Sequence, residues 1–470
     1  MGAIVSSRYR LVDRYAVYDV LRPLGETIDL VIPADAEYVV FDLDRTVHLG
    51  VTIGERIGWE IVLDPELKLS EDQALEPFFS WRRPLASLAR LERGVRYWGL
   101  AGLLYAATVR LGDRFDLWHR FLLRQLGPGY VERVQELLRA VLMVSQADYT
   151  PEQLARFAAR AWQRWRSRLV VDASVIERVR RRCPRLKAIL LSSASTRPTV
   201  EQAAAELGVD GFVSSAVDVC RQGDRELFSG PVGVPRWLRP KRPAFFSRPG
   251  AVFHNAAVNK VSLLRMKYPE VFAPGTVSVG ISDNNYGEDR TWSDYFTEVV
   301  ALNSRHPFSP FVAAGSPCRS ISSIDALPVG GGREQVRSLA AWLGTLEARV
   351  ADRPALAKLL GADAIERLER LSEQLRAARE RAGRRIDEEK RQWVAAVGAR
   401  LAAAVERYNA APAPEKTAIA RELDRLARRA RKVRSRLWRA ARESWPIEEQ
   451  IERLHDRAAR ALVVRQPARA

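Results

Sequence analysis

The sequence predicts an α/β fold in which a parallel sheet carries a long helical insertion and is followed by a helical C-terminal arm. Three observations indicate this class. Short β-branched runs alternate with helical segments, about 145 residues with helical patterning separate the first two runs, and heptad-like spacing fills the last part of the chain. A chain of 470 residues, 47% of them hydrophobic, has enough apolar material for two or three folded units.

The first 330 residues supply the strands and the insertion. Four apolar runs are predicted as buried parallel strands, at 38–41, 188–191, 277–281 and 298–302. The insertion between the first two is too long for a loop, so we expect a helical cap at about 50–180 over one edge of the sheet. We place the α/β domain at 36–302, after a lead segment at 1–35 that shows only strand-like alternation.

A change in composition ends this domain. Residues 303–332 are expected to be a linker, because prolines and glycines interrupt a Ser-rich stretch unsuited to a helix or a central strand. Residues 333–470 are then expected to form a basic helical or coiled-coil arm, through which the chain can form a homo-oligomer. Pro412 and Pro414 divide this arm into halves that can pack antiparallel.

The arm carries much of the formal net charge of +18. From Arg421 to Arg439 nine basic residues stand against two acidic ones around an apolar stripe. The solvated face of a coiled coil is one interpretation; the other is contact with nucleic-acid phosphates or an anionic membrane surface. No nucleic-acid fold signature accompanies the stripe, so we do not expect recognition of a base sequence.

Cysteine usage and hydropathy indicate the compartment. The three cysteines lie far apart without a CxxC pair, so neither a disulfide framework nor a zinc site is expected. The N-terminal residues have no long apolar core, and the longest uncharged apolar stretch, 97–109, is too short to cross a bilayer. The sequence therefore predicts a cytoplasmic protein with no transmembrane segment.

The first predicted strand runs directly into the sequence DLDRT at 42–46. It places Asp42 and Asp44 at the carboxyl end of a strand, where α/β sheets hold their ligands. Two like charges so close repel each other unless a cation or a shared proton neutralises them, so the pair indicates metal-assisted chemistry. One carboxylate could attack phosphorus while the other moves a proton.

This hhhDxDxT pattern resembles the first motif of the haloacid dehalogenase (HAD) superfamily, whose members are mostly Mg²⁺-dependent phosphohydrolases that form an aspartyl-phosphate. The strand at 188–191, which ends in Ser192 and Ser193, is similar to the second motif. The resemblance implies that Ser193, or alternatively Ser192, binds the transferring phosphoryl group. The helix and Leu-Gly step at 200–208 and the hairpin residues 227–230 look like the phosphoserine-phosphatase-like branch, in which a helical cap follows motif one.

The resemblance extends to a third and a fourth motif. Lys260 stands where the motif-three lysine is expected, with Lys267 as the alternative. The fourth motif departs from the usual Gly-Asp, because Ser282-Asp283 follows the strand at 277–281. Taking Asp283 as the metal ligand leaves Glu288 or Asp289 as the second acid. In the other register Gly280 is the motif glycine, and Ile281 replaces the ligand.

Together these motifs imply a Rossmann-like HAD core that hydrolyses a phosphomonoester, such as a phosphorylated small molecule. In this interpretation Asp42 is the nucleophile, and Asp44 is the general acid and base. Mg²⁺ is bound by Asp42, the Asp44 carbonyl and Asp283, and Ser193 and Lys260 hold the phosphoryl oxygens. Arg197 is a further candidate for contact with the substrate phosphate. The alternatives are a phosphotransferase, or a scaffold whose HAD-like domain is weakly active and whose basic arm binds a polyanion or a partner coiled coil.

Overall fold

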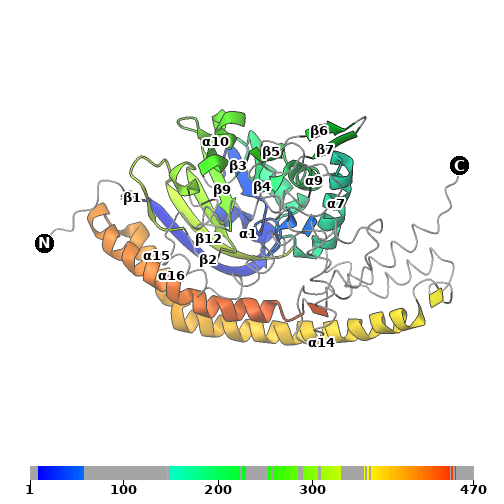
Figure 1. Ribbon diagram of the computed structural model, residues 1–470. Helices are drawn as coiled ribbons and strands as arrows, with labels where there is room; N and C mark the ends of the chain where they lie inside the picture. Colours follow the sequence, from blue (N-terminus) through cyan, green and yellow to red (C-terminus); the bar gives the residue numbers. More distant parts are fainter. Residues whose placement is uncertain are drawn as a thin grey trace, which may run out of the picture.

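The computed structural model describes residues 9–54, 56–57, 146, 149–217, 219–222, 225–228, 252–253, 255, 258–283, 289, 291–304, 308–329, 354, 357–358, 361–444, 446–447 and 450. Within these residues an α/β core lies beside a long pair of helices (Figure 1). Most of the cap expected at 50–180 falls outside the described residues. From that range the structure describes, among others, helix α7 (Pro151–Arg164), which a Thr150–Gln153 capping box begins.

The core is an eight-stranded sheet with the strand order β2-β12-β10-β9-β3-β4-β5-β8. Every neighbouring pair is parallel except β5 and β8 at one edge. In this order the strands are β2 (Arg14–Pro23), β12 (Ser320–Leu327), β10 (Glu298–Leu302), β9 (Ser278–Ser282), β3 (Tyr38–Asp42), β4 (Ala188–Thr196), β5 (Gly211–Val217) and β8 (Val252–Phe253). The four predicted strands correspond to β3, β4, β9 and β10, so the predicted α/β class with a Rossmann-like, mostly parallel sheet is confirmed.

Two short antiparallel pairs lie outside this sheet. β1 (Tyr9–Leu11) pairs with β11 (Phe311–Ala313), and β6 (Val219–Gln222) pairs with β7 (Arg225–Phe228). The second pair forms a hairpin in the region where the sequence predicted one.

Helices cover both faces of the sheet. On one face α1 (Leu24–Val31), α8 (Ala173–Arg182) and α9 (Arg197–Leu207) pack in a single core cluster with Val39 and Phe41 of β3. On the other face α10 (Val258–Lys267) and the 3₁₀ turns η4 (Pro269–Phe272) and η5 (Trp292–Asp294) pack with Tyr38 and Val40. Because alternate residues of β3 enter opposite cores, the strand is buried along its whole length and its carboxyl end is held firmly.

The segment 303–332 is not a simple linker, and here the structure corrects the sequence expectation. It contains β11 and β12, and β12 lies inside the sheet between β2 and β10. The prolines and glycines that suggested a linker lie outside the strand, whereas Ile321 and Ile324 enter the two opposite cores. The described part of the lead segment, residues 9–35, likewise belongs to the fold, because its strand β2 extends the sheet beyond β12.

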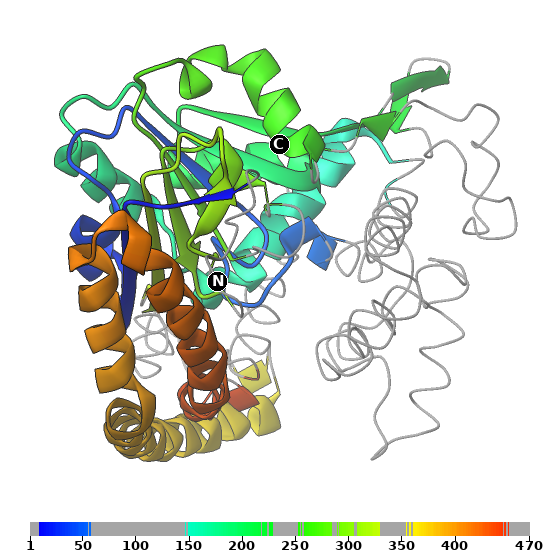
Figure 2. The same ribbon diagram turned by 90° about the vertical axis from the view of Figure 1, so that its left-hand side faces the viewer.

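The described part of the C-terminal region is helical, as predicted. It consists of α14 (Ala362–Trp393), a π-helical turn η6 (Val394–Gly398), α15 (Ala399–Ala410) and α16 (Ala413–Ala441). α14 and α16 lie side by side and run antiparallel, since Arg385 contacts Glu443 while Arg436 contacts Glu389 (Figures 1 and 2).

These helices are docked on the edge of the sheet. The Tyr408 hydroxyl donates to the Val12 carbonyl at 2.7 Å, and the Asn409 side chain pairs with both the N–H and the C=O of Tyr15 at 2.9 and 3.0 Å. Asn409 therefore satisfies backbone groups of the edge strand that would otherwise be open to another strand. Of the apolar heptad positions, those that the structure describes, among them Leu368 and Leu423, are buried within the chain. Homo-oligomerisation through the arm thus remains only a prediction.

Among the residues that the structure describes, no helix combines the length and the apolar character that crossing a membrane requires.

Candidate active site

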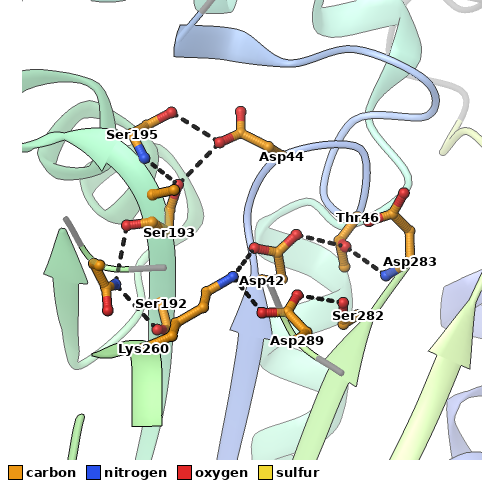
Figure 3. Close-up of polar contacts among 12 residues, drawn as sticks. Asp42, Asp44, Thr46, Ser192, Ser193, Ser195, Lys260, Ser282, Asp283 and Asp289 are labelled. Atoms are coloured by element: carbon orange, nitrogen blue, oxygen red, sulfur yellow. Dashed lines mark hydrogen bonds and ion pairs between the residues drawn. The ribbon is translucent and has the colours of Figure 1, made fainter. Parts of the chain in front are cut away.

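Asp42 ends β3 and stands at the centre of a polar cluster (Figure 3). Its side chain is buried, and both carboxylate oxygens are engaged. Lys260 Nζ lies 2.5 Å from Oδ1, and the Thr46 hydroxyl donates to Oδ2 at 3.0 Å. Thr46 also accepts a hydrogen bond from the backbone N–H of Asp283 at 3.0 Å. The loop after β3 and the loop after β9 are therefore joined beside the Asp42 carboxylate.

Lys260 reaches this cluster from α10, which packs against the sheet. Its side chain is buried, and its ammonium group lies between Asp42 and Asp289, 2.6 Å from Asp289 Oδ1. The ring of Trp292 lies beneath it, 5.3 Å from Nζ to the ring centroid. Two carboxylates and an aromatic face thus hold the Lys260 ammonium group in place, and the side chain is buried away from solvent.

Gly280 and Ile281, which define the alternative register of motif four, both pack in the core. A Cβ on Gly280 would lie 2.7 Å from the Trp292 ring and 2.9 Å from the Phe296 ring, so glycine is needed there for close packing. Ile281 is buried in the core on the opposite face. Asp283 follows the strand directly and lies beside Thr46, where the resemblance requires a ligand.

Asp289 is the acid of motif four that the structure brings to Lys260. It is buried, and the Ser282 hydroxyl donates to its Oδ2 at 2.5 Å. Glu288, the other candidate from the sequence, lies outside the described residues. Nothing in the sequence alone separated these neighbouring acids.

Two serines from the end of β4 hold Asp44. The hydroxyls of Ser193 and Ser195 donate to Asp44 Oδ2 at 3.0 and 2.8 Å, and the Ser195 N–H donates to Ser193 Oγ at 3.0 Å. Ser193 was expected in the site, whereas sequence reasoning missed Ser195. Gly54 packs against Ser195, since a Cβ at position 54 would lie 2.5 Å from the Ser195 hydroxyl oxygen.

The carboxyl end of β4 is supported by Asn255, which sequence reasoning also missed. The buried Asn255 amide donates to the carbonyls of Ser193 and Val213 at 3.0 Å each, and to Ser192 Oγ at 3.3 Å. Ser215 of β5 holds the next carbonyl, that of Ala194, at 2.7 Å. Because Asn255 and Ser215 hold these backbone carbonyls of β4, the Ser193 hydroxyl is kept in position beside Asp44.

The site concentrates negative charge. Burial, followed by the charges of Asp289, Asp283 and Asp44, raises the pKa of Asp42 well above its ordinary value, against the opposing effect of Lys260. Burial also raises the pKa of Asp283 to about 7, although Arg45 and Lys260 act in the other direction. Four carboxylates therefore share this site with the Lys260 ammonium and the nearby positive charge of Arg45.

Such an arrangement suits a hard divalent cation. Magnesium is commonly held by one or two carboxylates, with water and substrate phosphate completing its shell. Asp42, Asp283 and the Asp44 carbonyl are oxygen ligands of the right kind, and the charges of neighbouring carboxylates add to burial in raising the pKa values of Asp42 and Asp283. In the described part of the chain no three His, Cys, Asp or Glu side chains form a metal-binding group.

Two other residues considered from the sequence lie away from this cluster. Arg197 is exposed at the start of α9 and pairs with Glu201, at 3.5 Å. Lys267 is at the end of α10, where its ammonium group donates to the Phe212 carbonyl at 2.8 Å. The structure therefore brings together Asp42, Asp44, Ser193, Lys260 and Asp283, but not Arg197.

Comparisons with known proteins give fold similarity alone. No protein-family model matches the chain, and no curated protein matches its sequence. A protein of unknown function from Bordetella pertussis Tohama I is similar in structure with 13% identity and a TM-score of 0.32, over 57% of this chain and 91% of that one. A phospho-aspartyl intermediate analogue of phosphoserine phosphatase has 12% identity and a TM-score of 0.30, over 64% and 98%. A substrate-bound phosphoserine phosphatase complex has 12% identity and a TM-score of 0.29, over 57% and 87%.

The strand order shows where the motif residues lie relative to one another. The motif-one strand β3 lies between the motif-four strand β9 and the motif-two strand β4, and the motif-three lysine meets β3 at its carboxyl end. The core therefore has the mostly parallel α/β sheet that the sequence predicted, with Asp42 and Ser193 near the carboxyl ends of neighbouring strands and Lys260 beside Asp42.

Proposed function

We propose that this chain is a Mg²⁺-dependent phosphohydrolase that cleaves a phosphomonoester through a phospho-aspartate on Asp42. The observation that carries the proposal is the convergence of Asp42, Asp44, Ser193 and Lys260 from separate elements onto one buried site. An acid and base near a nucleophile, with a fixed cation beside the nucleophile, is the equipment that phosphoryl transfer requires.

The chemistry follows from the position of each group. An Asp42 carboxylate oxygen attacks phosphorus, and the bond from phosphorus to the leaving oxygen breaks. Asp44, whose Oδ2 is held by Ser193 and Ser195, donates a proton to that leaving oxygen. In the second step Asp44 takes a proton from the water that attacks the phospho-aspartate, which releases phosphate and regenerates Asp42.

Lys260 and Ser193 supply positive charge and a hydrogen-bond donor to the phosphoryl oxygens. Their contribution grows as negative charge spreads over those oxygens in the transition state, and their fixed positions remove the cost of reorganisation. A magnesium ion held by Asp42, the Asp44 carbonyl and Asp283 would offset the repulsion between the anionic nucleophile and the anionic substrate.

The test is phosphate release from a panel of phosphomonoesters with and without Mg²⁺. The wild type, Asp42→Asn and Asp283→Asn are compared with Asp363→Asn, a control at an exposed carboxylate on α14. We expect metal-dependent turnover in the wild type and the control, and its loss in both site variants. Absence of turnover across the panel, in a folded protein that binds Mg²⁺, would instead favour the scaffold alternative.

A further inference from the structure

The basic stripe on α16 has a specific geometry. Five exposed arginines, Arg421, Arg425, Arg429, Arg436 and Arg439, fall within about 80° of the helix circumference, at about 100° per residue. They span about 27 Å along the helix axis, given a rise of about 1.5 Å per residue. The buried residues Leu423, Leu426, Ala430 and Leu437 lie on the opposite side of the helix.

Most charges of this stripe have no partner among the residues that the structure describes. Arg436 contacts Glu389 at 3.7 Å, but the other four arginines form no ion pair or hydrogen bond with any residue that the structure describes. The neighbouring helix α14 carries nine basic and eight acidic residues, whereas α16 carries ten basic and three acidic ones. An uncompensated row of guanidinium groups repels itself and is relieved by an external polyanion.

We propose that the arginine stripe of α16 binds the phosphate backbone of duplex nucleic acid, without reading its base sequence. Guanidinium groups bind phosphates through paired hydrogen bonds, and a straight row of them fits the regular line of charge along a duplex. This function is separate from the proposed hydrolase activity, because the stripe lies on a different element from the catalytic groups.

Two other polyanions fit the stripe less well. A helix that lies on a membrane inserts an apolar face, but here that face is buried, and Trp438 packs against the core. Single strands are usually held by stacking on aromatic side chains, and Trp438 is the only aromatic residue in the sequence of α16. Charge alone, presented along a rigid line, therefore favours a duplex.

The test measures binding of the full chain to a short DNA duplex of mixed sequence over a range of salt concentrations. The stripe variant replaces Arg421, Arg425, Arg429 and Arg439 with Gln. A matched control replaces four exposed arginines of α14, Arg367, Arg376, Arg381 and Arg384, with Gln, so that both variants lose the same charge. Circular dichroism and phosphate release confirm that each variant is folded.

We count one phosphate contact for each of the four arginines without an ion pair. The logarithm of the association constant should then fall with the logarithm of the salt concentration with a slope of about −3 to −4. This corresponds to about 100-fold weaker binding at about 200 mM salt than at about 50 mM. The stripe variant should lose most of this slope, and the control should retain it. Failure of the wild type to bind duplex at low salt would overturn the proposal. So would an equal loss in the control, or binding to phosphatidylserine vesicles without binding to duplex.

Discussion

Lys260 Nζ lies 2.5 Å from Asp42 Oδ1, although 218 residues separate the two in sequence. Because Asp289 lies on the other side of the ammonium group, Lys260 holds together two buried carboxylates as well as facing the expected phosphoryl position. One side chain thus combines this structural role with the catalytic role that we propose for Lys260.

Replacing Lys260 should therefore affect both stability and activity. Lys260→Met leaves Asp42 and Asp289 buried without their cation, so we expect the free energy of unfolding to fall by about 3–5 kcal/mol near neutral pH. Turnover by the folded fraction should fall by about 10²- to 10³-fold. Denaturant unfolding and phosphate release measure the two effects, and near-wild-type turnover would contradict the assigned role of Lys260.

Asp283→Asn should stabilise the metal-free protein while abolishing metal-dependent turnover. The pKa of Asp283 is raised from 3.8 to about 7, so its protonated form is favoured by folding, and this contribution is lost as pH rises through about 7. Asparagine does not ionise, so at about pH 8 the variant should be more stable by about 1–3 kcal/mol. Thermal unfolding with and without Mg²⁺ checks this. Mg²⁺ should raise the Tm of the wild type only, and an equal rise in the variant would remove Asp283 from the ligand set.

Gly54 and Ser195 should act as a unit. Gly54→Ala places a methyl group against the Ser195 hydroxyl, so it should disturb the Ser195–Asp44 hydrogen bond much as Ser195→Ala removes it. We expect each change to lower kcat by about tenfold, and the double variant to be little worse than either, because neighbouring sites are not additive. Gly383→Ala, where the added Cβ meets nothing within 4 Å, is the control. Independent, multiplying effects would show that the two residues are not coupled.

His48 should make folding sensitive to acid. Burial lowers the pKa of His48 to about 3, and its ring packs edge-on against Trp162 with centroids 4.5 Å apart. Below about pH 6.5 the His48 ring therefore binds a proton in the unfolded chain but not in the folded protein. The free energy of unfolding falls as the pH drops towards 3. Between about pH 7.5 and about pH 4.5 this residue should account for a loss of about 2–3 kcal/mol. His48→Phe should remove that component, and an unchanged pH dependence would show that His48 is not its source.

The parts of the fold that sequence predicted are those with strong local patterns. The run at 38–41 is apolar and β-branched and ends in two acids, so its strand and its ligand position follow from a few residues. By contrast β12 is rich in serine, and its place in the sheet depends on β10 and also on β2, which lies far away in sequence. Periodicity alone could not indicate that pairing.

The same distinction applies to the site. Asp42, Asp44, Ser193, Lys260 and Asp283 stand in motifs, and the sequence alone proposed them as site residues. Sequence reasoning assigned no role to Thr46, the threonine of DxDxT. In the structure its hydroxyl donates to Asp42 and accepts from the Asp283 N–H, so it connects the two residues. Asn255 carries no local signal, because its function is to hold carbonyls of β4 and β5. Arg197 was suggested by its place after the serines of the second motif, but its side chain is exposed beside Glu201.

The most direct test of the central claim is capture of the phospho-aspartate. Asp44→Asn should still be phosphorylated by acetyl phosphate or p-nitrophenyl phosphate with Mg²⁺, but should hydrolyse the product slowly, because the base for the attacking water is gone. Mass spectrometry should then find one hydroxylamine-sensitive phosphoryl group on Asp42, absent when Asp42→Asn is added to the same variant. If the wild type releases phosphate from these compounds while Asp44→Asn carries no phosphoryl group, or carries it elsewhere, Asp42 is not the nucleophile.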